Sequence, residues 1–215
     1  PAGQAGDGKA RLAATIAALG GDAFLNIKQI MMKGEGEISP PGQEIVLPIT
    51  TATLIFAPPS RSRFELATAA GDVIIGSDGK SPAWLSVLGA IQDGPSGFGD
   101  PTELLRRAAT TAYPVTLVPD IKGDDGTMLP GFAVSDDQKR STKVYVDPKS
   151  GLPLRLVVQA AGVEVRLGDY HPTENVKLPG SLKVTQGGKA LLTLKFSSWA
   201  INKPVDDKLF VRPKS

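Results

Sequence analysis

Apolar and polar residues alternate along the C-terminal half of the chain, with the period of two that is typical of a strand with one buried face. In residues 141–147, Val144 and Val146 share one parity, and Lys143 and Tyr145 share the other. The same alternation recurs at 152–159, 163–167, 182–185 and 189–201, with turn residues between the segments. The pattern predicts hairpin-linked strands that form a curved antiparallel sheet with one apolar face.

The first half of the chain predicts a β-meander of adjacent antiparallel strands. Short segments at 51–57, 62–68 and 72–77 are separated by Pro and Gly residues, and Asp78-Gly79 is a strong hairpin dipeptide. These segments carry apolar residues at both parities, so both faces of the meander can take part in packing. Upstream, residues 30–38 alternate as a strand whose glycines leave room on the inner face.

Helices are predicted in two places. Residues 9–19 have helical apolar spacing and end at Gly20-Gly21, and a second short helix follows with Asp22 as its N-cap. The segment 89–130 is rich in Gly and Pro and predicts an irregular helical insertion that lies over the sheet as a lid. Residues 1–8 have a loose, Gly-rich sequence and are expected to be a flexible N-terminal remnant, left after removal of a signal or anchor segment.

Composition narrows the possible chemistry. The 215 residues include 24 Gly and 18 Pro, no Cys and a single His, with a formal net charge of +2. The missing Cys excludes disulfides and thiolate sites, and the single His excludes His-rich metal sites, so no metal and no cofactor are expected. The small net charge gives no footprint for nucleic acid, and no apolar run is long enough to span a membrane.

Candidate catalytic and metal-binding motifs are weak. His171 lies beside Pro172 in a turn-like context, without the Gly-x-Ser-x-Gly motif of a hydrolase. The acidic loop 120–126 resembles a calcium loop only faintly, because Lys122 occupies a ligand position. The glycine-rich loop 94–99 lacks the Lys-Ser/Thr of a phosphate loop. The sequence therefore predicts a protein that is not an enzyme.

A family resemblance rests on several phrases of the sequence. Residues 145–153 read YVDPKSGLP, and they are followed by Asp169-Tyr170 and by NVKLP at 175–179. The segments Ala18–Gly21 and Arg63-Phe64 are similar to the same group. Together these phrases resemble the outer-membrane lipoprotein-sorting proteins, which are bacterial envelope proteins with the LolA-like lipoprotein carrier fold.

The resemblance implies one LolA-like domain over residues 1–215: mainly β (α+β), an unclosed half-barrel formed by a strongly curved antiparallel sheet. The N-terminal and middle helices would act as plug and lid on its concave side. It also implies a non-catalytic periplasmic carrier that holds lipid or lipoprotein acyl chains in an apolar cavity, free or attached to a membrane through an N-terminal lipid anchor.

The alternative is an envelope sensor or scaffold domain that docks a protein partner and has no open lipid cavity. If the cavity exists, the alternating apolar positions give its wall. The expected wall residues, with Trp84 and Trp199 at the rim, are Leu54, Phe56, Phe64, Leu66, Ile74, Trp84, Val144, Val146, Leu154, Leu156, Leu194, Phe196 and Trp199. If instead these side chains simply fill a dry core, no ligand enters.

Overall fold

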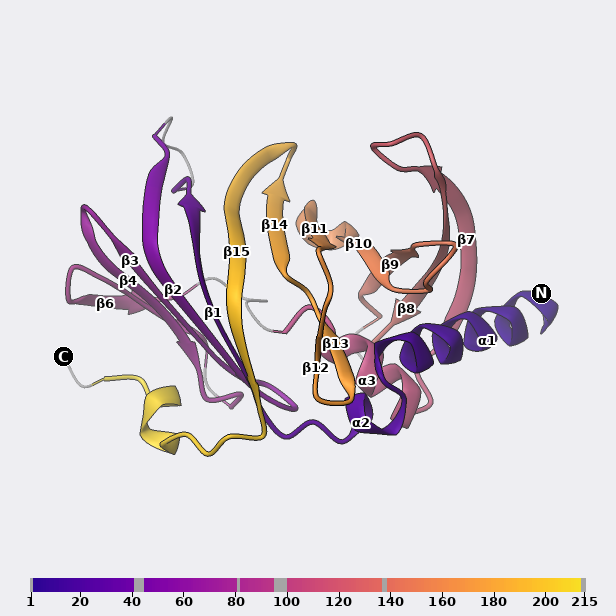
Figure 1. Ribbon diagram of the computed structural model, residues 1–215, viewed down its shortest axis with the longest axis horizontal. Helices are drawn as coiled ribbons and strands as arrows, with labels where there is room; N and C mark the ends of the chain where they lie inside the picture. The colour runs from indigo at the N-terminus through magenta and orange to yellow at the C-terminus, as the bar shows by residue number, and fades with distance from the viewer. Residues whose placement is uncertain (1, 41–44, 81, 95–99, 137–138, 214–215) are drawn as a thin grey trace. The chain divides into compact units, whose positions relative to one another are not determined.

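The structure is a computed structural model that describes residues 2–40, 45–80, 82–94, 100–136 and 139–213 (Figure 1). The chain forms two compact units. Unit 1 comprises Pro1–Asn26 and Pro101–Ala190, and unit 2 comprises Ile27–Asp100 and Leu191–Ser215. The chain therefore passes between the units more than once, and each unit is built from segments far apart in the sequence.

The protein is mainly β, as the sequence predicts. Unit 2 holds β1 (Ile30–Ile38), β2 (Leu47–Ala57), β3 (Arg61–Thr68), β4 (Gly71–Ser77), β5 (Trp84–Val87), β6 (Ala90–Asp93), most of β15 (Lys189–Ile201) and the short 3-10 helix η2 (Asp207–Phe210). Unit 1 holds β7 (Val115–Lys122), β8 (Met128–Ser135), β9 (Ser141–Val146), β10 (Pro153–Val158), β11 (Val163–Gly168), β14 (Ser181–Gln186), the ribbon of β12 (His171–Thr173) and β13 (Val176–Leu178), and the short 3-10 helix η1 (Gln159–Ala161). Three α-helices also belong to unit 1: α1 (Ala2–Leu19), α2 (Asp22–Leu25) and α3 (Glu103–Thr110).

Antiparallel hydrogen bonding connects 13 of the strands in the order β6-β5-β4-β3-β2-β1-β15-β14-β11-β10-β9-β8-β7. The first and last strands of this order, β6 and β7, are not neighbours of each other. The predicted sheet that does not close into a barrel is therefore confirmed. In each unit the strands are visibly curved (Figure 1).

The register of unit 2 sorts its side chains onto two faces. Leu54 pairs with Met32 on one side and with Phe64 on the other, and Phe64 pairs with Ile75. Side chains of directly paired residues point to the same face. We call the face that carries Met32, Leu54 and Phe64 the apolar face, and the other side of the same strands the opposite face.

The C-terminal segment packs on the opposite face of unit 2. Phe210 of η2 is 1% exposed and contacts Ile55 and Ala57 of β2. Arg63 donates a hydrogen bond from Nη1 to the carbonyl oxygen of Leu209 at 2.7 Å. The guanidinium of Arg61 lies 4.9 Å from the centroid of the Phe210 ring, within cation–π range. The segment around η2 is thereby fixed to β2 and β3.

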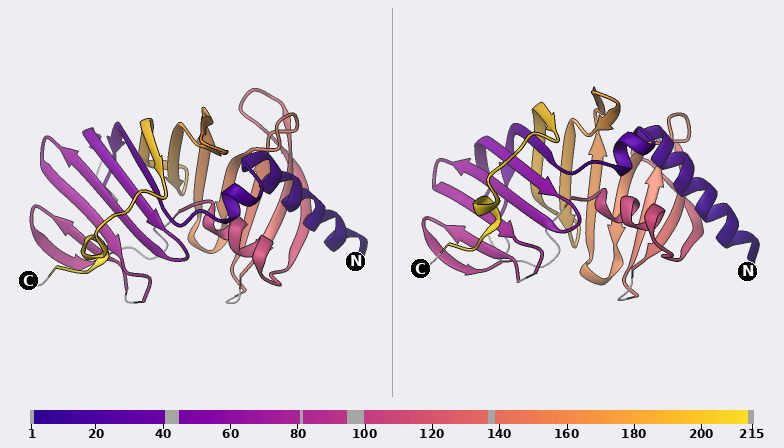
Figure 2. Two further views of the ribbon diagram at one scale, coloured as in Figure 1. Left: turned by 60° about the horizontal axis from the view of Figure 1, so that its bottom comes forward. Right: turned by 90° about the horizontal axis from the view of Figure 1, so that it is seen from below.

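The helices of unit 1 pack on its strands (Figure 2). Helix α1 contacts β7 and β8, and α3 contacts α1 and β8. A side chain at Gly8 could not be accommodated, because its Cβ would lie 2.8 Å from the carbonyl oxygen of Val115. Arg11 then donates a hydrogen bond from Nη1 to the carbonyl oxygen of Gly131 at 2.9 Å. Helix α1 begins at Ala2, so the segment that was expected to be a loose remnant is helical.

The structure differs from the sequence prediction in residues 89–130. An irregular helical insertion was expected there, but α3 is its only α-helix among the described residues, and β6, β7 and the start of β8 are strands. Pro119 fits within β7 because β7 is the last strand of the sheet order. The pairing of β7 with β8 also shifts register between Val118 and Ile121, and Pro119 lies within this irregularity.

Two glycines of β1 allow close contact with β15. A Cβ at Gly34 would lie 2.0 Å from the carbonyl oxygen of Lys195, and a Cβ at Gly36 would lie 1.9 Å from that of Thr193. Both distances are far below a van der Waals contact. The glycines were expected to leave room on the inner face, but what they allow is the approach of the neighbouring strand.

We therefore expect Gly34→Ala to lower the free energy of unfolding by about 2 kcal/mol or more, because the new methyl group forces β1 and β15 apart. Glu35→Ala on the same strand is the matched control, since Glu35 is exposed. Urea denaturation of the three proteins measures the difference. Equal stability of Gly34→Ala and the unchanged protein would contradict this account of the β1–β15 contact.

Candidate functional site

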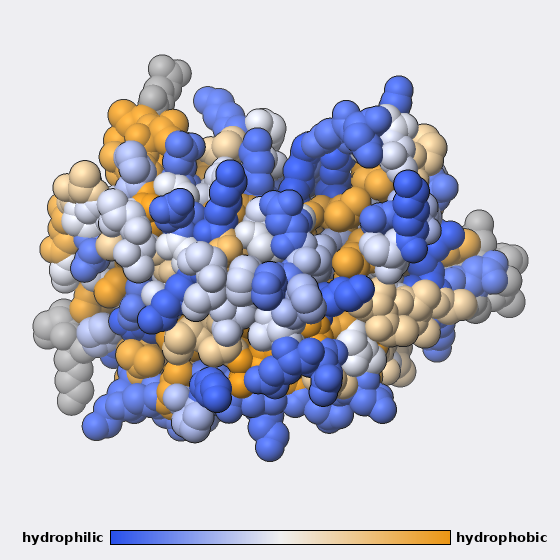
Figure 3. Space-filling view, viewed as in Figure 1, coloured by the Kyte–Doolittle hydropathy of each residue, from blue (hydrophilic) through white to orange (hydrophobic). Residues whose placement is uncertain are grey.

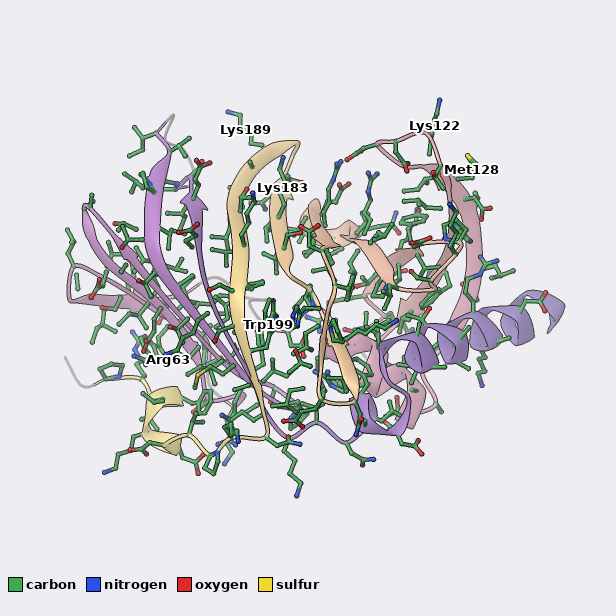
Figure 4. All side chains as sticks on the ribbon, viewed as in Figure 1. Arg63, Lys122, Met128, Lys183, Lys189 and Trp199 are labelled. Atoms are coloured by element: carbon green, nitrogen blue, oxygen red, sulfur yellow. The ribbon has the colours of Figure 1, made fainter. Side chains whose placement is uncertain are left out.

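Many of the expected wall residues lie together on the apolar face of unit 2. Leu54, Phe56, Phe64, Leu66, Leu194 and Phe196 are between 0% and 7% exposed. The rings of Phe56 and Phe64 meet edge to face, with their centroids 5.5 Å apart. Trp199 of β15 pairs with Met32, so it belongs to the same face, and it is only half-buried (Figure 4).

Two expected wall residues, Ile74 and Trp84, lie on the opposite face. Ile74 pairs with Glu65 and borders a shallow pocket of about 250 Å³ together with Thr53. Trp84 packs flat against Gly76, where a Cβ would lie 2.3 Å from the indole ring. The guanidinium of Arg63 covers the indole, 5.5 Å from its ring centroid. Trp84 is therefore 2% exposed and shares no face with Leu54 or Phe64.

The remaining wall residues belong to unit 1. Val144 pairs with Phe132 and with Leu156, and these side chains, together with Val146, are at most 4% exposed. Leu154 instead lines a pocket of about 430 Å³ that also contains charged side chains. The expected residues thus divide into one buried apolar face in each unit, with Ile74, Trp84 and Leu154 outside these faces.

The 430 Å³ pocket, which we call the charged pocket, was not predicted from the sequence. Arg155 of β10 and Arg166 of β11 are direct cross-strand partners. Asp124, from the β7–β8 turn, accepts a hydrogen bond from Nη2 of Arg155 at 3.1 Å and another from Nη1 of Arg166. Glu164 accepts from Nε of Arg166 at 2.6 Å and lies 3.5 Å from Nε of Arg155.

Hydrogen bonding to Glu164, together with the charges of Glu164 and Asp124, raises the pKa of Arg166. A sequence signal for this cluster exists, because Arg155 lies four residues before, and Arg166 four residues after, the turn 159–162 that joins β10 to β11. Asp124 carries no such signal, since it is 31 and 42 residues away from the two arginines.

The acidic segment 120–126 comprises the end of β7 and a hydrogen-bonded turn. Asp125 accepts hydrogen bonds from the backbone N–H and the hydroxyl of Thr127, both at 2.9 Å, and these bonds lower the pKa of the Asp125 carboxyl. The carboxylate of Asp124 is paired with the two arginines. Within the part of the chain that the structure describes, no group of three His, Cys, Asp or Glu side chains could hold a metal ion.

The other weak motifs have ordinary positions or lie outside the described residues. His171 is exposed and begins β12, where it pairs with Leu178. The glycine-rich loop falls outside the described residues apart from Gly94. Among the described helices, none combines the length and the apolar character needed to cross a membrane.

The sequence matches no protein-family model and no curated protein. Solved structures, however, superpose on most of the chain. A LolA superfamily protein from Nitrosomonas europaea aligns with a TM-score of 0.59 and 11% identity, over 95% of this chain and 97% of that one. The chain has a LolA-like fold. A DUF1329 family protein from Desulfovibrio piger aligns with a TM-score of 0.57 and 10% identity, over the same shares of the two chains.

At such low identity these structures establish the LolA-like fold and nothing about a ligand. The complex of MucA and MucB from Pseudomonas aeruginosa also aligns, over 96% of this chain and 61% of that one, with 18% identity. Its TM-score of 0.27 is too low to support any inference about this chain.

Tyr145, which pairs with Arg155 of the charged pocket, should make the free energy of unfolding depend on pH. Tyr145 is 5% exposed and its ring lies over Gly131 of β8. Burial raises its pKa, while the charge of Arg155 opposes this shift. Because the folded state holds the proton more tightly, this contribution to stability is complete below pH 10 and is lost as the pH rises through the raised pKa.

We expect the free energy of unfolding to fall with pH above about 10, and to fall less steeply in Tyr145→Phe. Chemical denaturation at several alkaline pH values measures both slopes. Tyr145→Phe preserves the ring packing and removes only the titrating hydroxyl. Identical slopes for the two proteins would show that Tyr145 does not have the raised pKa.

Proposed function

We propose that the protein is a non-catalytic carrier of the bacterial envelope that holds an acyl chain of a lipid or lipoprotein against the apolar face of unit 2. The observation that supports this proposal is the chemical uniformity of that face. Across β1, β2, β3, β4 and β15, the described residues of this face are apolar, glycine, serine or threonine, with no charged side chain. The LolA-like fold, together with the sequence resemblance, favours a location in the periplasm.

Such a surface suits an acyl chain on energetic grounds. Burial of each CH₂ group contributes about 0.8 kcal/mol, and this interaction requires no particular direction. A face built from Leu54, Phe56, Phe64 and Phe196 offers continuous apolar contact without the polar groups that a catalytic site needs. A carrier of this kind binds its ligand through buried apolar area, so its specificity for the chemical structure of the acyl chain is low.

The same side chains are already buried in the structure, which constrains how a ligand enters. At 0% to 7% exposure, Leu54, Phe64 and Phe196 contact other side chains of the protein and not solvent. An acyl chain must therefore replace apolar contacts that the protein makes with itself. Since both kinds of contact are apolar, the exchange is nearly balanced in free energy.

The burial of the apolar face also favours a second candidate function. If the cover over the face stays in place, no acyl chain enters, and the fold serves as a sensor or scaffold domain that docks a protein partner in the envelope. The two functions differ in whether a ligand reaches the apolar face. An experiment that detects a ligand in contact with that face therefore distinguishes them.

The two tryptophans of the chain provide this experiment, because they lie on different faces of unit 2. Trp199 pairs with Met32 on the apolar face, whereas Trp84 packs on Gly76 of the opposite face. Trp84→Phe leaves Trp199 as the fluorophore, and Trp199→Phe leaves Trp84. We expect dibromostearate to quench the fluorescence of Trp84→Phe strongly, and that of Trp199→Phe weakly, because bromine quenches an indole only at close range.

Unbrominated stearate is the control for effects other than contact quenching, and thermal unfolding shows that each variant is folded. Equal quenching of the two variants would mean that the fatty acid binds elsewhere. No quenching of either variant would contradict the carrier and support the docking function.

A further inference from the structure

The two arginines of the charged pocket form an unfavourable pair that requires an anion. Arg155 and Arg166 lie directly opposite each other on β10 and β11. Like charges in directly opposed cross-strand positions destabilise a hairpin. The Arg155 side chain is 14% exposed and that of Arg166 is 37% exposed, so solvent screens this repulsion incompletely. Carboxylates on both sides of the pair offset the repulsion.

Glu164 holds the two arginines from the side of the strand. It contacts the Nε atoms of Arg166 and Arg155, at 2.6 Å and 3.5 Å. Each guanidinium also directs one terminal nitrogen at the carboxylate of Asp124. Nη2 of Arg155 and Nη1 of Arg166 thus converge on one point, which is the arrangement that recognises a carboxylate or a phosphate.

Asp124 occupies that point, and its side chain is held there by the two arginines, whereas the other acids of the pocket are hydrogen-bonded within their own turns. Asp125 is hydrogen-bonded to Thr127, and Asp147 accepts hydrogen bonds from the backbone of Lys149 and the hydroxyl of Ser150. The Asp124 side chain is 73% exposed, and the contacts described for its carboxylate are those to the two arginines. Asp124 reaches the two arginines from the β7–β8 turn, which is flanked by Lys122 and Met128 (Figure 4).

The surroundings of the arginines suit an anion that carries an apolar group. Leu129, Leu154 and Leu167 line the charged pocket beside the two guanidinium groups, and Lys149 adds a positive charge to its wall. The volume of about 430 Å³ lies within the range of small-molecule sites. Hydrophilic and hydrophobic surface are correspondingly interleaved over the strands of unit 1 (Figure 3).

We propose that Arg155 and Arg166 form a binding site for the anionic group of a ligand, a phosphate monoester or a carboxylate, and that Asp124 is an internal occupant which the ligand displaces. The charged pocket lies in unit 1, and the apolar face proposed to hold an acyl chain lies in unit 2. This site therefore goes beyond the carrier function, and either proposal can fail without the other.

Calorimetric titration with dodecyl phosphate below its critical micelle concentration, and with inorganic phosphate, tests the site. Asp124→Asn keeps the size of the side chain and removes its charge. We expect it to bind dodecyl phosphate about fivefold more tightly than the unchanged protein, because an exposed ion pair no longer competes. The matched control is Asp207→Asn, since Asp207 is a comparably exposed acid paired with Arg61, and we expect no change in affinity.

Replacement of an arginine of the charged pocket should weaken the binding of dodecyl phosphate. Arg166→Gln is expected to weaken binding about tenfold, because one of two charge-assisted contacts is lost. Arg166→Lys retains the charge, so it tests the site even if Arg166→Gln does not fold, and it should bind more weakly than the unchanged protein because the fork geometry is lost.

The two probes also distinguish the possible sources of the anion. Preference for dodecyl phosphate indicates a lipid-like ligand whose stem contacts the leucines, and equal affinity indicates a free phosphate. Binding of neither probe by Asp124→Asn at millimolar concentration would overturn the proposal. So would an affinity of Asp124→Asn no higher than that of the unchanged protein.

Discussion

The antiparallel register of unit 2 is the constraint on which the candidate site depends. Pairing of Met32, Leu54 and Phe64 places these side chains on one face, and pairing of Lys33, Thr53 and Glu65 places the polar ones on the other. A slip of one residue in any of these strands would exchange the two sets. Gly34 and Gly36 allow β15 to approach closely enough to complete the apolar face with Leu194 and Phe196.

The same register gives the opposite face its separate role. Ile55 and Ala57 point to that side, and Phe210 of the C-terminal segment packs on them. Arg63 joins this segment to the sheet through the carbonyl of Leu209 and also covers Trp84. One face of the strands is thus used to fix the η2 segment. The other remains chemically uniform, as a surface for an acyl chain would need to be.

The two proposed sites use different physics. The apolar face of unit 2 has no directional contacts, so it would hold a ligand through buried area. The charged pocket of unit 1 presents convergent guanidinium nitrogens, so it would select a ligand by charge and geometry. When no ligand is bound, Asp124 accepts hydrogen bonds from these nitrogens. Its negative charge offsets the electrostatic repulsion between the two adjacent arginines.

Much of the fold follows from the sequence, because the signals are local. Alternation in residues 141–147 and 152–159 predicts β9 and β10, and Asp147–Gly151 is the turn between them. Strand β7 was missed because Pro119 usually interrupts a strand, and only the sheet order shows that β7 is an edge. The face of Ile74 could not be read from its neighbours, since Val73 and Ile75 are apolar too and only the pairing with Glu65 decides it.

The apolar face was easier to predict from the sequence than the charged pocket, because its residues follow a pattern within each strand. Leu54, Phe56, Phe64 and Leu66 keep one parity within their own strands, so the sequence allows them to share a face, although Ile55 is apolar at the other parity. The charged pocket combines Asp124 with arginines that are 31 and 42 residues away, and such a contact exists only once β7 to β11 are assembled. Contacts between distant segments are set by tertiary structure, which local patterns do not encode.

Native mass spectrometry of the protein purified from its own envelope without detergent tests the carrier function most directly. If the apolar face holds acyl chains, a fraction of the protein will carry the added mass of a lipid or an acylated peptide, and denaturation will release it. A single species at the mass of the chain alone, from material never exposed to detergent or organic solvent, would contradict the account.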